Sequence, residues 1–307
     1  MYDGGHREVF SVKYRILTFD GGGIRGSLTA TLLKRLNDLY PSLIGSADLF
    51  AGTSVGSFFA LGLAYGLSAD DMVRFNSEQN WRFIFTPERP GLFRPKYGID
   101  HLVRTLAAIF PQDLRLADLG RHVLVTAFQV TGAAGEYWHP VLFHNFPGSA
   151  TRDALVLDAA LASGAAPVYF PSHKHYVDGA VVANNPSTAA ISLAVDRGRE
   201  LGDICLLSIG TGLNPDRIEA DTTRWGASQW ILTPSPPFPL ISAMLDGGSE
   251  LDVIVSSRLL GKRFFRLNPL LPRTVMIDDY KAIPELVALG KTYDLGPVAA
   301  WIEEYWL

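Results

Sequence analysis

Cysteine is almost absent from this sequence, and its scarcity narrows the possible chemistry. The 307 residues include one cysteine, Cys205. A single cysteine cannot form an intrachain disulfide, and no Cys/His spacing suggests a zinc site. Cys205 lies within the apolar run 204–207, so we expect a buried thiol in a reducing, cytoplasmic environment. We expect neither a metal nor a cofactor.

Clustered positive charge is also missing. The chain has 27 Lys and Arg against 31 Asp and Glu, which gives a net charge of −4. Without a basic cluster there is no electrostatic reason to expect a nucleic acid partner. Residues 1–6 have neither a basic start nor an apolar segment, which argues against a signal peptide. The uncharged run 49–69 is long enough to span a bilayer. Its glycines and hydroxyl side chains favour a turn instead, and we expect no transmembrane segment.

Apolar residues are plentiful, at 48% of the chain, which is enough for a large core. Short apolar runs alternate with helical periods, a pattern typical of a mainly parallel sheet flanked by helices. We therefore expect one three-layer α/β domain over residues 1–307, with its core motifs in about 14–212. Residues 213–307 would add a Pro-rich loop at 233–239 and C-terminal helices.

Individual elements can be predicted from the same periodicity. The expected strands are residues 14–19, 48–51, 123–128 and 204–209, and a hairpin turn is expected at 132–135. The expected helices are one that buries Leu28, Leu32, Leu33, Leu36 and Leu39, one that follows residue 54, and those at 186–196 and 244–260.

The first motif that carries chemistry is Gly52-Thr53-Ser54-Val55-Gly56. It lies between an expected strand and an expected helix, a setting in which a sharp turn exposes a serine hydroxyl. The flanking glycines remove Cβ atoms that would clash at such a turn, and the helix N-terminus behind it favours negative charge. The five-residue pattern also occurs by chance, but its setting predicts that Ser54 is a nucleophile.

A serine nucleophile needs a base, and the histidines do not supply the usual one. The common α/β-hydrolase order places the histidine after the acid, yet none of the seven histidines follows Asp178. Asp153 or Asp158 with His173 or His175 would fit that order, although no motif supports such a pair.

Asp178 stands in the tripeptide Asp178-Gly179-Ala180, directly after the apolar pair Tyr176-Val177. A carboxylate at a strand end beside small residues can come within hydrogen-bonding reach of a serine hydroxyl. Burial among apolar groups would also raise its basicity. The alternative is an aspartate in an ordinary turn.

Residues 20–26, Asp-Gly-Gly-Gly-Ile-Arg-Gly, form the third motif. Consecutive glycines after a strand leave backbone amides free to point at one anion, as an oxyanion hole requires. The segment also satisfies the G-x-G-x-x-G pattern of a dinucleotide site. Asp20 would place a carboxylate beside the pyrophosphate, and Asp48, the acid about 20 positions on, opens the next strand instead of ending it. Both details argue against nucleotide binding.

Together these motifs resemble the patatin-like phospholipase family. The agreement extends to 92–97 and 184–186, and the resemblance covers about 16–289. The resemblance implies a catalytic dyad of Ser54 and Asp178, without histidine or metal. It implies an oxyanion hole, and it implies that Arg25 braces the glycine loop or adds positive charge. The residues so implied are Gly21, Gly22, Gly23, Arg25 and Val55 for the hole, with Gly52, Gly56 and Gly179 in support.

The same resemblance implies hydrolysis of fatty acyl esters of lipids, with a lipid or membrane surface as partner. Aromatic and aliphatic residues crowd 225–241, where we expect a mobile lid or lipid-contacting rim; rings that cap the core are the alternative. Two other functions stay open. One is an effector phospholipase switched on by a small nucleotide signal or by homo-oligomerisation, and the other is a catalytically silent lipid-binding module. Peripheral contact with a membrane also stays open.

Overall fold

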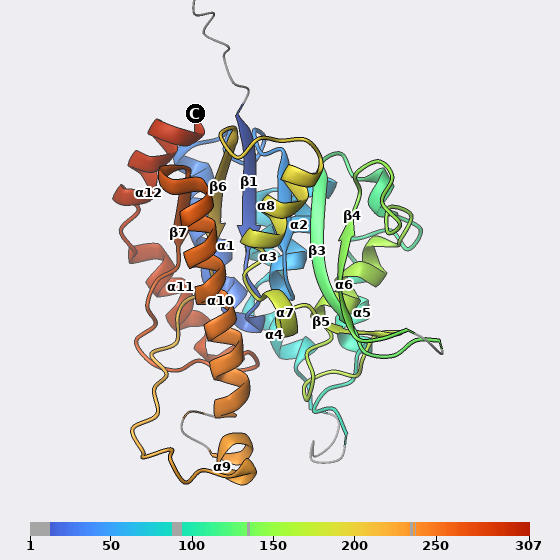
Figure 1. Ribbon diagram of the computed structural model, residues 1–307, viewed down its shortest axis with the longest axis vertical. Coiled ribbons are helices and arrows are strands. Elements are labelled where there is room, and N and C mark those ends of the chain that lie inside the picture. Colours follow the sequence, from blue (N-terminus) through green and yellow to red (C-terminus); the bar gives the residue numbers. More distant parts are fainter. Residues whose placement is uncertain (1–12, 88–93, 134–135, 234–235, 237) are drawn as a thin grey trace, which may run out of the picture.

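The computed structural model describes residues 13–87, 94–133, 136–233, 236 and 238–307 (Figure 1). Several sequence predictions concern residues outside this part of the chain. These are the N-terminal residues 1–6, positions 92–93 of the family resemblance, positions 134–135 of the expected hairpin turn, and positions 234, 235 and 237 of the Pro-rich loop.

The strands form one mixed sheet whose centre is parallel. They are β1 (Tyr14–Phe19), β2 (Leu49–Gly52), β3 (His122–Gln129), β4 (His139–His144), β5 (Tyr176–Asp178), β6 (Ile204–Ile209) and β7 (Phe264–Leu267). Their order is β4-β3-β2-β1-β6-β7, with β5 also paired to β3. Only β4 and β5 run antiparallel to their neighbour β3 among these described strands. The expected mainly parallel sheet is therefore confirmed.

Helices follow most of the strands. They are α1 (Gly26–Leu39), α2 (Val55–Tyr65), α3 (Ala69–Phe75), α4 (Glu78–Ile84), α5 (Asp100–Ala107), α6 (Val156–Gly164), α7 (Ala180–Ala183), α8 (Ser187–Asp196), α9 (Ala227–Leu232), α10 (Pro239–Leu260), α11 (Ile283–Thr292) and α12 (Gly296–Trp301). A short 3-10 helix, Gly23–Arg25, precedes α1.

Helices cover both faces of the sheet, because alternate residues of the central strand β1 belong to two different core clusters. Leu17 and Phe19 of β1 belong to a large core cluster that includes residues of α1, α2, α6 and α11. Tyr14 and Ile16, at the alternate positions of the same strand, belong to a second cluster with residues of α8 and with Leu260 of α10. Successive side chains of a strand point to opposite faces. Figure 1 shows α8 and α10 in front of the sheet, so the three-layer α/β architecture is confirmed.

The element bounds agree with the sequence predictions except in a few places. The strands expected at 14–19 and 204–209 have those bounds, and Cys205 is buried. The helix expected to begin at residue 244 begins at Pro239 instead. Proline is tolerated at the first position of a helix because the missing N–H has no intrahelical acceptor there. Leu39, expected on the buried face of α1, is the last residue of that helix and is 58% exposed, so this part of the prediction is wrong.

The uncharged run 49–69 is divided between β2, a turn and α2, with α3 beginning at its last residue. In the described part of the chain, no helix has both the length and the apolar character that crossing a bilayer requires.

Candidate active site

The three sequence motifs meet at one edge of the sheet. Phe19 of β1 pairs with Gly52 of β2 and with Ile209 of β6, so these parallel strands end side by side. The glycine loop follows β1 and the serine turn follows β2. Asp178 is the last residue of β5 and pairs with Ala127 near the end of β3. The parallel register thus brings the ends of these strands together.

Ser54 occupies a strained turn between β2 and α2. Its backbone has φ 54° and ψ −126°, which is unusual for a residue with a side chain. A Cβ atom on Gly52 would lie 2.0 Å from the carbonyl oxygen of Gly56, and one on Gly56 would lie 2.1 Å from that of Phe19. The two glycines are therefore required by close backbone packing. The amide of Ser54 donates to Oγ of Ser163 at 2.8 Å, which helps to hold the turn.

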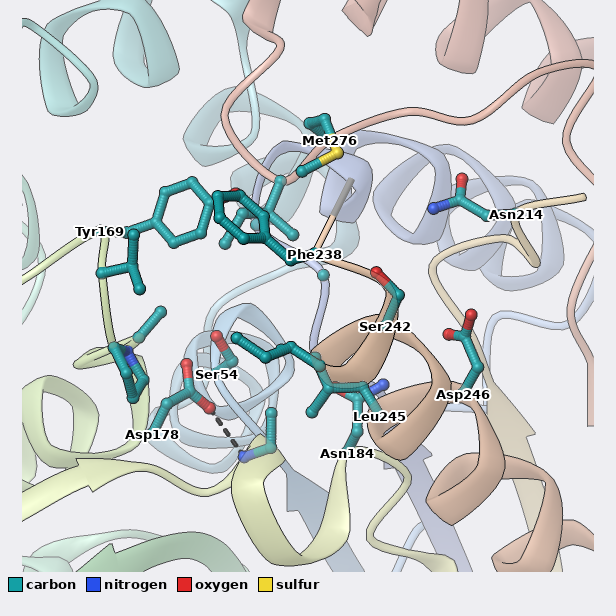
Figure 2. A pocket seen from close by; sticks show the side chains of 18 of the residues that line it. Ser54, Tyr169, Asp178, Asn184, Asn214, Phe238, Ser242, Leu245, Asp246 and Met276 are labelled. Atoms are coloured by element: carbon teal, nitrogen blue, oxygen red, sulfur yellow. Dashed lines mark hydrogen bonds between the residues drawn. The ribbon is translucent and has the colours of Figure 1, made fainter. Parts of the chain in front are cut away.

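Asp178 is buried, with 2% of its surface exposed. Burial raises the pKa of its carboxyl group to about 7, while hydrogen bonds from the Ala180 amide and the Ser54 side chain oppose that rise. The Ala180 amide donates to Oδ1 at 2.8 Å. Figure 2 shows the carboxylate and the Ser54 hydroxyl side by side at the cavity wall. A Cβ atom on Gly179 would lie 2.1 Å from Oγ1 of Thr126, which explains the glycine that follows the aspartate.

Two residues of the glycine loop line the cavity and have amides without a backbone acceptor in the described loops and turns. They are Gly22 (φ 156°) and Gly23 (φ 56°). The amide of Val55, the first of α2, has no intrahelical acceptor, and Val55 lines a smaller cavity that adjoins the main one at Ser54. These three N–H groups are therefore free to bind an anion.

Gly21 is a correction to the sequence prediction. Its amide donates to the carbonyl oxygen of Asn184 at 3.0 Å, so it is not available to an oxyanion. A Cβ atom on Gly21 would lie 2.3 Å from Oδ1 of Asn184 and 3.2 Å from Cβ of Ser54. The absence of a side chain at Gly21 thus allows the two segments to approach, and this is its role in the site.

Arg25 is 9% exposed and lines the cavity. Its Nε donates to the carbonyl oxygen of Gly22 at 3.4 Å and its Nη1 to that of Gly212 at 3.2 Å. Burial lowers the pKa of the guanidinium, and Asp246, followed by Asp20 and Asp216, raises it. These contacts are those of a brace that holds the glycine loop in place.

Asp20 and His173 have partners away from the reaction centre. Asp20 is buried and forms a two-pronged ion pair with Arg266, whose Nη1 donates to Oδ1 at 2.8 Å. The alternative pair of Asp158 and His173 does form, with Nε2 of His173 2.8 Å from Oδ1. Neither residue lines the cavities beside Ser54, and the described lining of those cavities contains no histidine.

The main cavity at Ser54 has a volume of about 370 Å³. Apolar side chains form most of its wall, as Figure 2 shows for Tyr169, Phe238, Leu245 and Met276. The smaller cavity, of about 20 Å³, is lined by side chains that include Phe58, Trp81, Leu102 and Phe170. Ser54 therefore lines two apolar spaces.

Several residues that line the main cavity were not predicted from the sequence. Asp216 and Asp246 face the main cavity from a loop and from α10, and Ile277 lies against the glycine loop. Each is an isolated residue without a motif, so no sequence signal could have found it. In the part of the chain that the structure describes, no three His, Cys, Asp or Glu side chains are grouped to hold a metal ion.

Comparisons with known proteins agree with this geometry. A family model described as patatin-like phospholipase matches residues 17–191. Protein teg of Priestia megaterium is 38% identical, over 96% of this chain and 99% of its own length. The putative sporulation hydrolase CotR of Bacillus subtilis is also 38% identical, over 96% of this chain and 98% of its own. A cGAMP-activated phospholipase of Vibrio cholerae is 32% identical over 64% of each chain.

Proposed function

The chain belongs to the patatin-like phospholipase family, and from this premise we propose that it hydrolyses fatty acyl esters of lipids with Ser54 as nucleophile and Asp178 as general base. The observation that carries the proposal is the convergence of a strained serine, a buried carboxylate with a raised pKa, and unpaired glycine amides at one cavity.

The first half of the reaction acylates the serine. Oγ of Ser54 attacks the ester carbonyl while Asp178 accepts its proton. The amides of Gly22 and Gly23, with that of Val55, donate to the oxyanion of the tetrahedral intermediate. As the intermediate collapses, the C–O bond to the alcohol breaks and Asp178 returns the proton to the leaving oxygen. Water then attacks the acyl-enzyme with the same assistance, releasing the fatty acid and restoring Ser54.

A lone aspartate is a weak base at its ordinary pKa of about 3.9. Burial raises the pKa of Asp178 to about 7, which brings its basicity close to that of the histidine in a conventional triad. This environment supports a dyad in which Asp178 needs no histidine relay.

The apolar residues at the mouth of the cavity support the proposals of a lipid substrate and of contact with a membrane. Four residues, which we call the mouth rim, both line the cavity and are 45% to 65% exposed: Val168, Val181, Ile241 and Met244. Exposed apolar residues around an opening favour contact with a lipid surface. Nearby, Ile231 and Leu232 of α9 are 47% and 69% exposed, which supports the lipid-contacting part of the expectation for 225–241.

The test is lipid mass spectrometry after incubation of the protein with mixed membrane lipids. Wild type is expected to release fatty acids and leave the deacylated lipids. Ser54→Ala and Asp178→Asn are expected to lose about a thousandfold in rate, because each removes a partner of the same proton transfer. Circular dichroism checks that both variants stay folded. Undiminished release by either folded variant would remove that residue from the mechanism.

One alternative is activation by a signal, which the similarity to a cGAMP-activated phospholipase favours. In that case fatty acid release would appear only after a cyclic dinucleotide is added. A catalytically silent lipid-binding module, the other alternative, would bind the same vesicles and release nothing under either condition.

A further inference from the structure

We propose that the polar end of the cavity selects lipids whose head group donates hydrogen bonds and carries no net negative charge, an inference that rests on the proposed hydrolase activity of Ser54. Asp216 and Asp246 line the same cavity as Ser54. Figure 2 shows Asp246 and Asn214 across the cavity from Ser54 and Asp178. A lipid with its ester at Ser54 would extend either its acyl chain or its head group toward this end.

The balance of charge at this end is negative. Arg25 is the one cationic side chain among the described residues that line the cavity, against the two carboxylates of Asp216 and Asp246. Both of these carboxylates act on Arg25 and raise the pKa of its guanidinium. Because Arg25 already donates to the carbonyls of Gly22 and Gly212, it is not a free phosphate ligand.

Asp246 is the acceptor most available to a ligand. It is half-buried on α10 and accepts no hydrogen bond from the residues that the structure describes. Asp216, by contrast, accepts from the Thr274 hydroxyl. The Asn214 side chain is engaged with the backbone of Val275, whose amide donates to its Oδ1 at 2.9 Å. Burial raises the pKa of Asp246, Arg25 lowers it, and the Asp216 and Glu250 carboxylates raise it.

These features favour some head groups and disfavour others. A carboxylate accepts hydrogen bonds from hydroxyl or ammonium groups. A phosphate monoester at the same place would bring further negative charge beside two carboxylates in a partly desolvated cavity, where repulsion is weakly screened. A site built around acceptors therefore rejects a ligand that offers only acceptors.

The test compares two lipids that differ by one phosphate, 1-monooleoylglycerol and 1-oleoyl lysophosphatidic acid, in micelles of a neutral detergent. Wild type is expected to show at least a roughly tenfold higher kcat/KM on the monooleoylglycerol. In Asp246→Asn this ratio is expected to fall about fivefold, because the repulsion of the phosphate weakens and the hydroxyls lose an ionised acceptor.

Glu200→Gln is the control. It removes one negative charge from the exposed surface, and Glu200 neither lines the cavity nor acts electrostatically on Asp246 or Arg25. Its ratio is expected to stay within about twofold of wild type, because water and salt screen an exposed charge. Asp216→Asn is a second variant, expected to change the ratio in the same direction as Asp246→Asn.

Two further substrates test whether net negative charge on the head group lowers the rate even when the head group can donate hydrogen bonds. Lysophosphatidylethanolamine offers an ammonium group and no net charge, whereas lysophosphatidylglycerol offers hydroxyls with a net negative charge. Preference for the former over the latter supports exclusion of net negative charge. Equal rates on both would overturn that exclusion.

Preference of wild type for lysophosphatidic acid, or an equal change on both lipids in Asp246→Asn and Asp216→Asn, would overturn this inference. Hydrolysis of p-nitrophenyl butyrate, which has no lipid head group, keeps the two proposals apart. If that ester is hydrolysed while the predicted lipid preference fails, the head-group inference alone is wrong. If wild type hydrolyses neither the ester nor any lipid, the proposed function fails and this inference fails with it.

Discussion

Asp178 is buried, and its carboxylate forms no ion pair with a described residue. Two hydrogen bonds stabilise its ionised form, but burial outweighs them and raises its pKa to about 7. An ion pair would have lowered that pKa and made the carboxylate a poorer base. Asp20, which is also buried, does pair with Arg266. Burial still raises the pKa of its carboxyl group, while Arg266 and then Arg25 oppose that rise, and the ion pair holds the start of the glycine loop.

A pH dependence of activity follows from the raised pKa of Asp178. The residue must be ionised to accept the proton of Ser54, so kcat/KM is expected to rise about tenfold per pH unit below about pH 7 and to level off above it. Initial rates on p-nitrophenyl butyrate between pH 5 and 9 measure this profile. A profile that is already level at pH 5 would contradict the assignment of Asp178 as a base of raised pKa.

The glycine loop shows how an element positions chemical groups through its backbone. Gly23 opens the short 3-10 helix at φ 56°, and a Cβ atom there would lie 2.2 Å from the carbonyl oxygen of Ile277. That carbonyl accepts a hydrogen bond from the amide of Ile24 at 2.9 Å. Arg25 and Ile277 therefore both hold the loop, and its residues Gly22 and Gly23 line the cavity.

Substitution of Gly23 tests this arrangement. Gly23→Ala is expected to lower kcat about a hundredfold or more, because the clash with Ile277 displaces at least one oxyanion donor, whose loss costs about 3 kcal/mol. Its matched control is Gly198→Ala, where φ is also positive (83°) but a Cβ atom would meet nothing within 4 Å. The control is expected to lose roughly 1 kcal/mol of stability and keep its activity.

Thermal unfolding and kcat on p-nitrophenyl butyrate, measured on both variants, separate backbone strain from the loss of the donor. Comparable kcat values in the two variants would show that the Gly23 amide takes no part in catalysis.

At the scale of the whole molecule, the C-terminal third completes both the sheet and the cavity. β7 extends the sheet beyond β6, and α10 contributes Ile241, Met244 and Asp246 to the cavity wall. We propose that residues 1–307 form one domain, because α11 and α12 also share the large core with the strands that carry the motifs.

The mouth rim is the part of the surface that would meet a lipid layer. The double variant Ile241→Ser, Met244→Ser is expected to lose roughly tenfold more activity on phospholipid vesicles than on p-nitrophenyl butyrate. Each large apolar side chain transferred from water contributes about 1–2 kcal/mol to such contact. Leu251→Ser is the control on the same helix, since Leu251 is 59% exposed and does not line the cavity. Equal losses on both substrates would argue against contact through this rim.

Much of the fold and of the site could be predicted from the sequence, because short-range constraints set them. The strands at 14–19 and 204–209 are apolar runs bounded by polar residues, and their bounds are confirmed. The turn at Ser54 depends on Gly52 and Gly56, which its own backbone geometry requires. These features follow from steric rules that act over a few residues.

Other features of the site depend on contacts between segments far apart in the chain. The amide of Gly21 donates to the carbonyl oxygen of Asn184, and the residues near Gly21 in the sequence do not predict this hydrogen bond. Asp216 and Asp246 become part of the cavity because a loop and α10 pack beside the strand ends. The basicity of Asp178 is set by the packing of distant segments around it. Local sequence determines which backbone shapes are possible, but burial and the choice of hydrogen-bond partners arise only when the whole chain excludes water from the site.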